Sequence, residues 1–239
     1  MEQLPAKTQD YLKVIWDLQE RSGGKVALGE VAERMGEKKP TASEAIKKLA
    51  ERGFVLHQPY KGISLTDHGR EIALVMIRRH RLIECFLHAK LGYSWDEVHE
   101  EAEMLEHAVS DDFIARIDAQ LGHPSHDPHG DPIPNEAGEM AQMVLEDLSG
   151  LQPGDRAMVE RVSDSDPELL RYLAQAGVGP GTVLQAEPAP YVGIRVFAIV
   201  DSAGIAPVEG GGDSSDRKNT IHVVDTALWA IKVRTQQPE

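Results

Sequence analysis

The chain has 239 residues, of which 41% are hydrophobic and 27% charged, so it can bury a substantial core and is expected to form two or three domains. No apolar run approaches the roughly 18 residues of a membrane span, and "MEQLPAKTQD" lacks the basic and apolar regions of a signal peptide; we expect a cytoplasmic protein. The single cysteine, Cys85, excludes an intrachain disulfide and a multi-cysteine zinc site.

The net charge of −14 is spread unevenly along the chain. Residues 1–70 contain 12 Lys and Arg against 10 Asp and Glu, residues 71–150 contain 5 against 17, and residues 151–239 contain 8 against 12. Seven of the ten histidines also lie in the middle third. Carboxylates and imidazoles gathered in one region favour a site for a divalent cation. The N-terminal third is the only one with a positive balance, and therefore the best suited to nucleic acid.

The first third of the chain has the element order of a winged helix-turn-helix. Helical periods predict a helix over 4–20, a short one over 26–36 ending at Gly36, and a third from about Pro40 to Arg52. "FVLHQPYKGISLT" then predicts two strands joined by a turn. A generic small helical domain would also fit. The third helix, which would enter the major groove, carries lysines suited to phosphates and polar side chains suited to base edges. The expected DNA-binding set is Lys38, Lys39, Pro40, Thr41, Ser43, Glu44, Lys47, Lys48 and Lys61.

The middle third predicts three helices. A long one starts after a cap at Thr66 or Asp67 and places His80 and Glu84 one turn apart. The next, over about 94–110, contains "HEEAEMLEH", in which two histidines bracket four glutamates. At about 100° per residue, His99, Glu103, Glu106 and His107 share one stripe beside an apolar stripe. This pattern favours a metal site at the edge of a core; the alternative is an acidic, water-facing helix. A third helix follows in "DDFIARIDAQLG".

The rest of the chain changes character. "HPSHDPHGDPIPNE" is too rich in Pro and His to be regular, and we interpret it as a structural loop rather than a weak metal sink. Beyond residue 150, five short β-rich segments, a helical insert over 164–177 and a glycine-rich loop over 209–219 predict a small barrel. We expect domains at 1–70, 71–148 and 149–239.

The runs "KKPTASEAIKKLAERGFV", "RRHRLIECFL", "WDEVHEEAEMLEHAVSDD" and "PHGDPIP" together resemble the diphtheria-toxin-repressor family of metal-activated transcriptional repressors, over nearly the whole chain. The resemblance implies a mainly α fold with a small β domain: a winged helix-turn-helix, a helical dimerisation and metal-binding domain, and a C-terminal SH3-like β barrel. It also implies a homodimer that binds a palindromic DNA operator and controls metal-uptake genes. No enzyme activity, small organic substrate or membrane partner is expected.

Carried over by position, the resemblance implies two metal sites, and so two ions per chain. The primary site would use Asp10, Glu103, Glu106 and His107. The ancillary site would use His80, Glu84 and His99, with Asp166 and Glu168 supplied by the C-terminal domain.

The choice of metal depends on two of these positions. Iron-responsive members of the family have Met in place of Asp10 and Cys in place of Glu103, whereas manganese-responsive members have this acidic pair. Carboxylate oxygens suit the hard Mn²⁺ ion, so we expect Mn²⁺, with Fe²⁺ as the alternative. Two-domain manganese members have a further Glu where this chain has Lys13, which favours two separate mononuclear sites. A metal-dependent hydrolase is the alternative from another class, but the sequence contains no nucleophile constellation.

Overall fold

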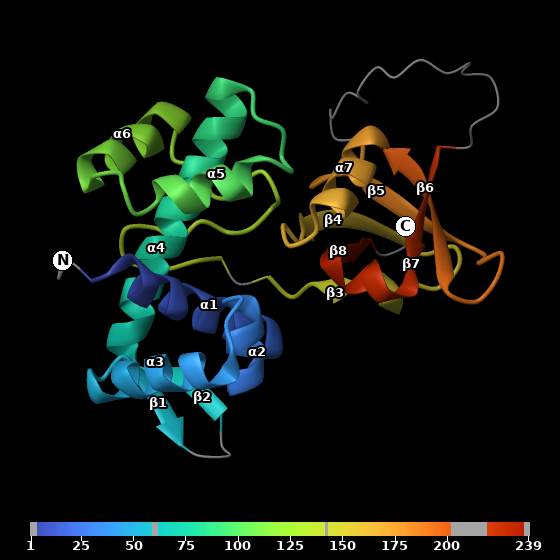
Figure 1. The fold of residues 1–239 in the computed structure, drawn as a ribbon. Coiled ribbons are helices and arrows are strands. Elements are labelled where there is room, and N and C mark those ends of the chain that lie inside the picture. Colours follow the sequence, from blue (N-terminus) through green and yellow to red (C-terminus); the bar gives the residue numbers. More distant parts are fainter. Residues whose placement is uncertain (1–3, 59–61, 142, 202–218, 237–239) are drawn as a thin grey trace.

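A computed structural model describes residues 4–58, 62–141, 143–201 and 219–236 of the chain, and Figure 1 shows their arrangement. The N-terminal domain contains α1 (Ala6–Ser22), α2 (Leu28–Arg34), α3 (Lys39–Glu51), β1 (Val55–Gln58) and β2 (Gly62–Leu65). Its two strands pair antiparallel, with Val55 opposite Leu65, and Ile63 forms a further bridge with Val26. The predicted winged helix-turn-helix order is confirmed.

Helix α4 (Asp67–Phe86) runs through both helical domains. It begins where the Thr66 hydroxyl accepts a hydrogen bond from the Gly69 N–H, as the capping signal predicts. Gly69 allows close packing, because a Cβ atom there would lie 2.0 Å from the Phe54 carbonyl oxygen. Buried residues from the first half of α4, as far as Ile77, belong to the N-terminal core, while Leu82 and Ile83 belong to the next. The expected boundary at residue 70 therefore lies within a helix that both domains share.

The middle domain adds α5 (Val98–Leu105) and α6 (Asp111–Leu121). Helix α4 continues into a π-helical turn, Leu87–Leu91, which ends at Gly92 with φ +77°. The helix predicted over about 94–110 is shorter in the structure, and Glu106 and His107 lie in the turn that follows α5. The Ala108 N–H bonds to the carbonyl of Leu105, three residues back, which tightens the chain and ends the helix.

The C-terminal domain is built on one antiparallel sheet with the strand order β3-β8-β4-β5-β6-β7. The strands are β3 (Glu146–Asp147), β4 (Arg156–Val162), β5 (Val183–Glu187), β6 (Ile194–Asp201), β7 (Thr220–Val224) and β8 (Ile231–Gln236), and α7 (Pro167–Gln175) follows β4. The five predicted strands and the helical insert are confirmed; β3, with two residues, is too short to show a period. Most of the predicted glycine-rich loop lies outside the described residues.

Two of the contacts by which the C-terminal domain docks against the middle domain involve backbone carbonyl groups. Trp95, from the segment before α5, is buried in the C-terminal core, and its indole N–H donates to the Leu170 carbonyl at 3.0 Å. The loop over 123–136 forms the second of these contacts, where the Val162 N–H donates to the His129 carbonyl at 2.9 Å. Gly130, with φ +88°, is required there because a Cβ atom would lie 1.9 Å from the Glu160 carbonyl oxygen. Docking brings the residues after β4 toward α4 (Figure 1). Within the described part of the chain, no helix is long and apolar enough to cross a membrane.

Candidate metal centre

One cluster of possible metal ligands joins the N-terminal domain to the middle domain. It consists of Asp10 from α1, with Glu106 and His107 from the turn after α5. Asp10 Oδ1 lies 2.7 Å from His107 Nε2, and Glu106 Oε1 lies 3.4 Å from the same nitrogen. Glu106 is fully buried, whereas Asp10 remains partly open to solvent. Three donors from two domains thus converge on one point.

Gln9 orients His107 within this cluster. The side-chain amide of Gln9 donates from Nε2 to the Leu4 carbonyl at 3.3 Å, which leaves Gln9 Oε1 as the acceptor 2.8 Å from His107 Nδ1. The Gln9 acceptor keeps a proton on His107 Nδ1 and so favours the tautomer in which Nε2, the nitrogen hydrogen-bonded to Asp10, binds an ion once its own proton has left. A metal-ligating histidine needs this tautomer, and a hydrogen bond to its other nitrogen is the usual way to hold it. Gln9 is not among the residues predicted from the sequence, because it precedes Asp10 but belongs to no recognisable motif.

Lys13 contacts the other two acidic residues predicted for the primary site. Its Nζ lies 2.6 Å from Glu103 Oε1 and 2.7 Å from Glu106 Oε1. Among the described residues, Glu103 joins a ligand cluster with His80 and Glu106 but not with Asp10 and His107. Three of the four predicted primary ligands, Asp10, Glu106 and His107, thus lie together. The fourth, Glu103, lies apart from Asp10 and His107 and shares Lys13 with Glu106.

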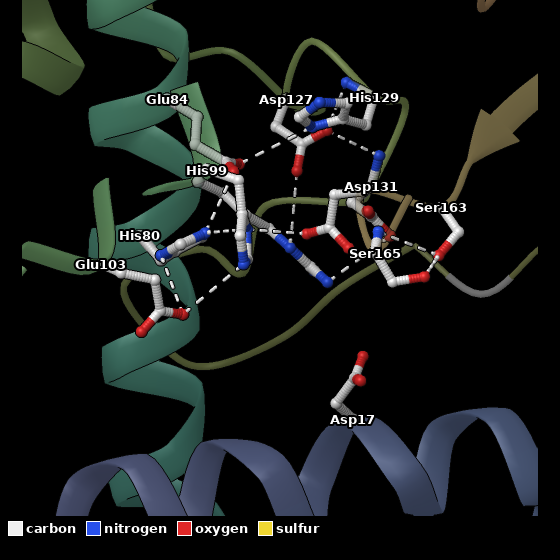
Figure 2. Close-up of polar contacts among 12 residues, drawn as sticks. Asp17, His80, Glu84, His99, Glu103, Asp127, His129, Asp131, Ser163 and Ser165 are labelled. Atoms are coloured by element: carbon white, nitrogen blue, oxygen red, sulfur yellow. Dashed lines mark hydrogen bonds and ion pairs between the residues drawn. The ribbon is translucent and has the colours of Figure 1, made fainter. Parts of the chain in front are cut away.

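A second cluster brings His80 and Glu84 of α4 together with His99 of α5 and Asp164 (Figure 2). His80 Nε2 lies 3.0 Å from Glu84 Oε1 and 3.2 Å from His99 Nδ1. His99 Nδ1 lies 3.0 Å from Asp164 Oδ2 and 3.5 Å from Glu84 Oε1. The i, i+4 spacing on α4 places the first two donors on one face, and packing of α5 against α4 brings the third.

Asp164 lies beside the second cluster, in the place that the resemblance assigned to Asp166 and Glu168. The Asp166 carboxylate accepts hydrogen bonds from the N–H groups of Glu168 and Leu169, so it caps α7. Both Asp166 and Glu168 are exposed. An N-cap carboxylate must point along its own helix, and it is therefore Asp164, two residues earlier in the turn after β4, that reaches His99. The structure thus places a different residue of the same segment beside the cluster.

Burial and close charges shift the pKa values of these groups. Burial raises the pKa of Asp10, and the neighbouring His107 offsets this only in part. Burial disfavours charge on His99, but hydrogen bonds to Asp164 and Glu84 outweigh it and raise the pKa of His99 to about 10. Burial likewise opposes ionisation of Asp164, yet its hydrogen bond to His99 holds the Asp164 pKa well below the usual range. In the second cluster, the negative charge of the carboxylates is thus balanced by positive charge on a neighbouring histidine.

Glu106 links the two clusters. Its Oε1 faces His107 and Lys13, while its Oε2 accepts a hydrogen bond from His80 Nδ1 at 2.6 Å. Because Nδ1 of His80 donates to Glu106, Nε2, which faces Glu84 Oε1 at 3.0 Å, is the nitrogen that can bind an ion once its own proton has left. A change at one cluster therefore alters the hydrogen-bond partner of a ligand in the other.

A network of ion pairs connects all three domains beside the second cluster. Arg161 of β4 forms ion pairs with Asp131, in the loop over 123–136, and with Glu20 of α1, the latter at 3.1 Å. Arg81 of α4 pairs with Asp131 at 3.5 Å. A β-bulge between Val159 and Arg161 shifts the register of β4 against β8 and alters the direction of the strand at this point. These ion pairs couple the position of the C-terminal domain to that of the DNA-binding domain.

His129, which the sequence analysis assigned to a structural loop, is fully buried in this region. Its Nε2 donates to the Trp95 carbonyl at 2.6 Å, and its ring stacks on the Trp95 indole. These contacts hold together two segments at which the C-terminal domain docks.

The predicted DNA-binding residues lie along one face of the N-terminal domain. Lys38 precedes α3 and the others are on it, apart from Lys61, which lies outside the described residues. All of the described ones are exposed except Ser43, which is half-buried. Lys48 lies 3.6 Å from Glu44, and Lys47 lies 4.0 Å from Glu51, in i, i+4 pairs that hold the side chains over the helix surface. In a winged helix-turn-helix the corresponding helix is the one that enters the major groove, so these exposed side chains remain the predicted DNA contacts.

The fold and these clusters define a DNA-binding regulator that responds to a metal ion. Residues 3–63 match the family described as the N-terminal DNA-binding domain of iron-dependent repressors, and residues 66–135 match the metal-binding and dimerisation domain of the same proteins. Residues 147–203 match the FeoA domain. The chain belongs to the diphtheria-toxin-repressor family of metal-dependent transcriptional repressors, which confirms the resemblance. It is a DNA-binding repressor and not an enzyme, and its partners are DNA and a second copy of itself.

The similar proteins include repressors described as iron-dependent and repressors described as manganese-dependent. The chain is 32% identical over 209 residues to an iron-dependent repressor of Mycobacterium tuberculosis, covering 82% of this chain and 90% of that one. It is 31% identical over 244 residues to the diphtheria toxin repressor of Corynebacterium glutamicum, covering 98% of each. A solved structure described as a manganese-dependent transcriptional repressor in complex with manganese is 46% identical, with a TM-score of 0.83 over 96% of this chain and all of that one. Another, the manganese regulator SloR, is 32% identical, with a TM-score of 0.73.

Proposed function

We propose that this protein is a Mn²⁺-activated repressor that binds a palindromic operator as a homodimer and controls metal-uptake genes. The observation that carries the proposal is the approach of Asp10 Oδ1 to His107 Nε2, at 2.7 Å across the boundary between the DNA-binding and middle domains. An ion held there would connect the domain that reads DNA to the domain that forms the dimer.

The donor chemistry supports manganese. The first cluster offers carboxylate oxygens and one imidazole nitrogen, with no sulfur atom, and such a hard set suits Mn²⁺ better than later, softer ions. The similarity to a manganese-dependent repressor points the same way, while the mycobacterial relative keeps Fe²⁺ as the second candidate.

Two clusters support two ions per chain. We assign Asp10, Glu106 and His107, joined by Glu103, to the primary site. The ancillary site would comprise His80, Glu84, His99 and Asp164, with Asp164 in the role first expected of Asp166 or Glu168.

Coupling to DNA follows from which domain supplies each ligand. A ligand shifts a conformational equilibrium only through its different affinity for the two states. Asp10 completes the primary site only when α1 is docked against the turn after α5, so an ion stabilises the docked arrangement. In a dimer, docked N-terminal domains can hold two recognition helices near the roughly 34 Å spacing of successive major grooves. Arg161, with its contacts to Asp131 and Glu20, supports the same arrangement from the C-terminal domain.

The experiment is an operator-binding titration against free Mn²⁺, Fe²⁺ under anaerobic conditions, Co²⁺ and Zn²⁺. We expect dimeric binding that requires metal, with activation by Mn²⁺ in its physiological range. His107→Ala should abolish this activation. Operator binding that is equally tight in the presence of a chelator would contradict the proposal, and activation by Fe²⁺ alone would replace manganese with iron.

The ancillary assignment has its own matched pair of variants. Asp164→Ala removes a carboxylate 3.0 Å from His99, whereas Asp166→Ala removes the exposed cap of α7 two residues later. We expect only Asp164→Ala to eliminate one of two Mn²⁺-binding steps in calorimetry. Loss of a step in Asp166→Ala instead would return that residue to the site.

A further inference from the structure

Lys13 occupies a central position among the predicted primary ligands. It lies on α1 one turn after Asp10, and its side chain is largely buried. Its ammonium group approaches Glu103 Oε1 at 2.6 Å and Glu106 Oε1 at 2.7 Å. Lysine is seldom buried unless it is paired, so both carboxylates are needed to keep this charge inside the protein.

The lysine and a metal ion would compete for the same oxygen atoms. Glu106 Oε1, which accepts from Lys13, is also the oxygen that faces His107 Nε2 at 3.4 Å. An ion between His107 and Asp10 would bind that oxygen and would lie close to the ammonium group. Glu103, the remaining predicted ligand, is held by Lys13 away from Asp10 and His107. An ion there would compete with the lysine for the charge of this carboxylate.

Electrostatics explains why a cation is needed at this point. Glu106 lies fully buried between Asp10 on one side and Glu103 on the other, and burial penalises unbalanced charge there. Although burial opposes the charged form of Lys13, the two glutamates outweigh it and raise the pKa of Lys13. Burial also opposes ionisation of Glu106, but His80 and Lys13 lower the pKa of Glu106 below its usual range. Both shifts favour a charged Glu106 paired with a charged Lys13, so the protein's own cation balances the buried carboxylate.

We infer that Lys13 is a built-in competitor of the primary metal ion: its ammonium neutralises Glu103 and Glu106 in the metal-free protein, and binding of the ion displaces it from Glu103. Lys13 thereby sets the concentration of free metal at which the repressor responds. This inference rests on the proposed function, because it concerns the affinity of the proposed primary site. In this role the lysine opposes metal binding, whereas a ligand favours it.

A purely structural role for Lys13 predicts a result of the opposite sign. If the lysine only holds Glu103 and Glu106 in the geometry that the ion needs, its removal must weaken metal binding. If the lysine competes, its removal destabilises the metal-free protein, relieves repulsion in the metal-bound protein, and must tighten metal binding.

The test compares Lys13→Met with Lys7→Met. Methionine retains most of the length of lysine without its charge. Lys7 lies on the same helix, exposed and paired with Glu37 away from the cluster, so its replacement makes the same change in net charge. For Lys13→Met we expect a lower melting temperature without metal and at least about tenfold tighter Mn²⁺ binding at fixed pH and ionic strength, within the range usual for coupling between two sites. Lys7→Met should match the parent in Mn²⁺ affinity. Lys13→Arg keeps the charge and should bind Mn²⁺ far more weakly than Lys13→Met.

Each other outcome has a definite meaning. Unchanged or weaker Mn²⁺ binding by Lys13→Met would overturn the inference. Failure of Lys13→Met to fold even at saturating Mn²⁺ would also overturn it, because a displaced cation is dispensable once metal is bound. His107→Ala, titrated alongside, identifies the binding step of the primary site: if it leaves every step unchanged, the proposed site is wrong, whereas loss of a step without an effect of Lys13→Met refutes only the role of the lysine.

Discussion

Replacement of Asp10 by alanine tests whether a metal ion connects the DNA-binding domain to the rest of the repressor. Asp10 is the only member of the first cluster that comes from α1, 97 residues before His107 in the chain. Burial raises the pKa of Asp10, so its carboxylate is held at a cost that alanine removes. We therefore expect metal-free Asp10→Ala to fold and dimerise as the parent does, with an equal or slightly higher melting temperature.

The size of the effect on metal binding follows from the number of donors. Asp10 is one of three converging donors, and a hydrogen bond to a charged group contributes about 1.5–3 kcal/mol, which we take as a lower bound for a carboxylate that binds the ion directly. The loss corresponds to about 10- to 150-fold weaker Mn²⁺ binding at the primary site, since about 1.4 kcal/mol is a factor of ten. A dimer contains two such sites, so the loss in operator-binding free energy at limiting metal is about 3–6 kcal/mol.

The assay combines calorimetry with Mn²⁺ and operator binding measured at saturating Mn²⁺. Asp17→Ala is the matched control: Asp17 lies two turns later on α1 and lines a surface pocket together with Asp10, but it pairs with Arg21 and belongs to none of the clusters among the described residues. It should bind metal and operator like the parent. If Asp10→Ala binds the operator as tightly as the parent once metal is saturating, Asp10 does not couple metal to DNA and the clamp mechanism is refuted.

Three further predictions concern selectivity, DNA contacts and protons. Asp10→Met combined with Glu103→Cys should move activation from Mn²⁺ toward Fe²⁺, Co²⁺ or Ni²⁺, because soft donors replace oxygen; an unchanged rank order of metals in operator binding would show that these positions do not set selectivity. Lys47→Ala or Lys48→Ala should weaken binding to all DNA sequences similarly and reduce the salt slope by about one, if the lysines contact phosphates; a loss confined to one base position would make them base readers. At pH 7 the raised pKa of about 10 keeps His99 protonated in the metal-free protein, so Mn²⁺ must displace that proton and its affinity for the ancillary site should rise as pH rises toward 10. The same shift stabilises the metal-free fold below pH of about 6.5, and this contribution is lost as pH rises through the folded-state pKa. Calorimetry in buffers of different protonation enthalpy should detect the released proton, and a proton count equal to that of His99→Ala would contradict the assignment.

Local patterns were sufficient to predict most helices and strands, and to predict which possible ligands lie on the same face of one helix. The i, i+4 spacing of His80 and Glu84 places both donors on one face of α4 because a helix has a fixed period. The order of helices and strands in the N-terminal domain follows from caps, apolar periods and a turn, which are properties of neighbouring residues. The stripe through His99, Glu103, Glu106 and His107 predicted metal chemistry, although α5 ends at Leu105. Of the four, Glu106 and His107 belong to the first cluster and His99 to the second, while Glu103 joins only a group with His80 and Glu106.

Contacts between domains could be decided only by the tertiary structure. Asp164 rather than Asp166 reaches His99, because Asp166 is committed to the cap of α7 and because Gly130 lets the loop over 123–136 approach β4 closely. Whether Lys13 faces solvent or two carboxylates depends on how α1 packs against residues about ninety positions later, and no local period encodes that distance. Sequence periodicity determines which side chains share a face of one helix; which faces meet depends on packing between elements, and in this protein the ligands from α1 and from the segment after β4 depend on that packing.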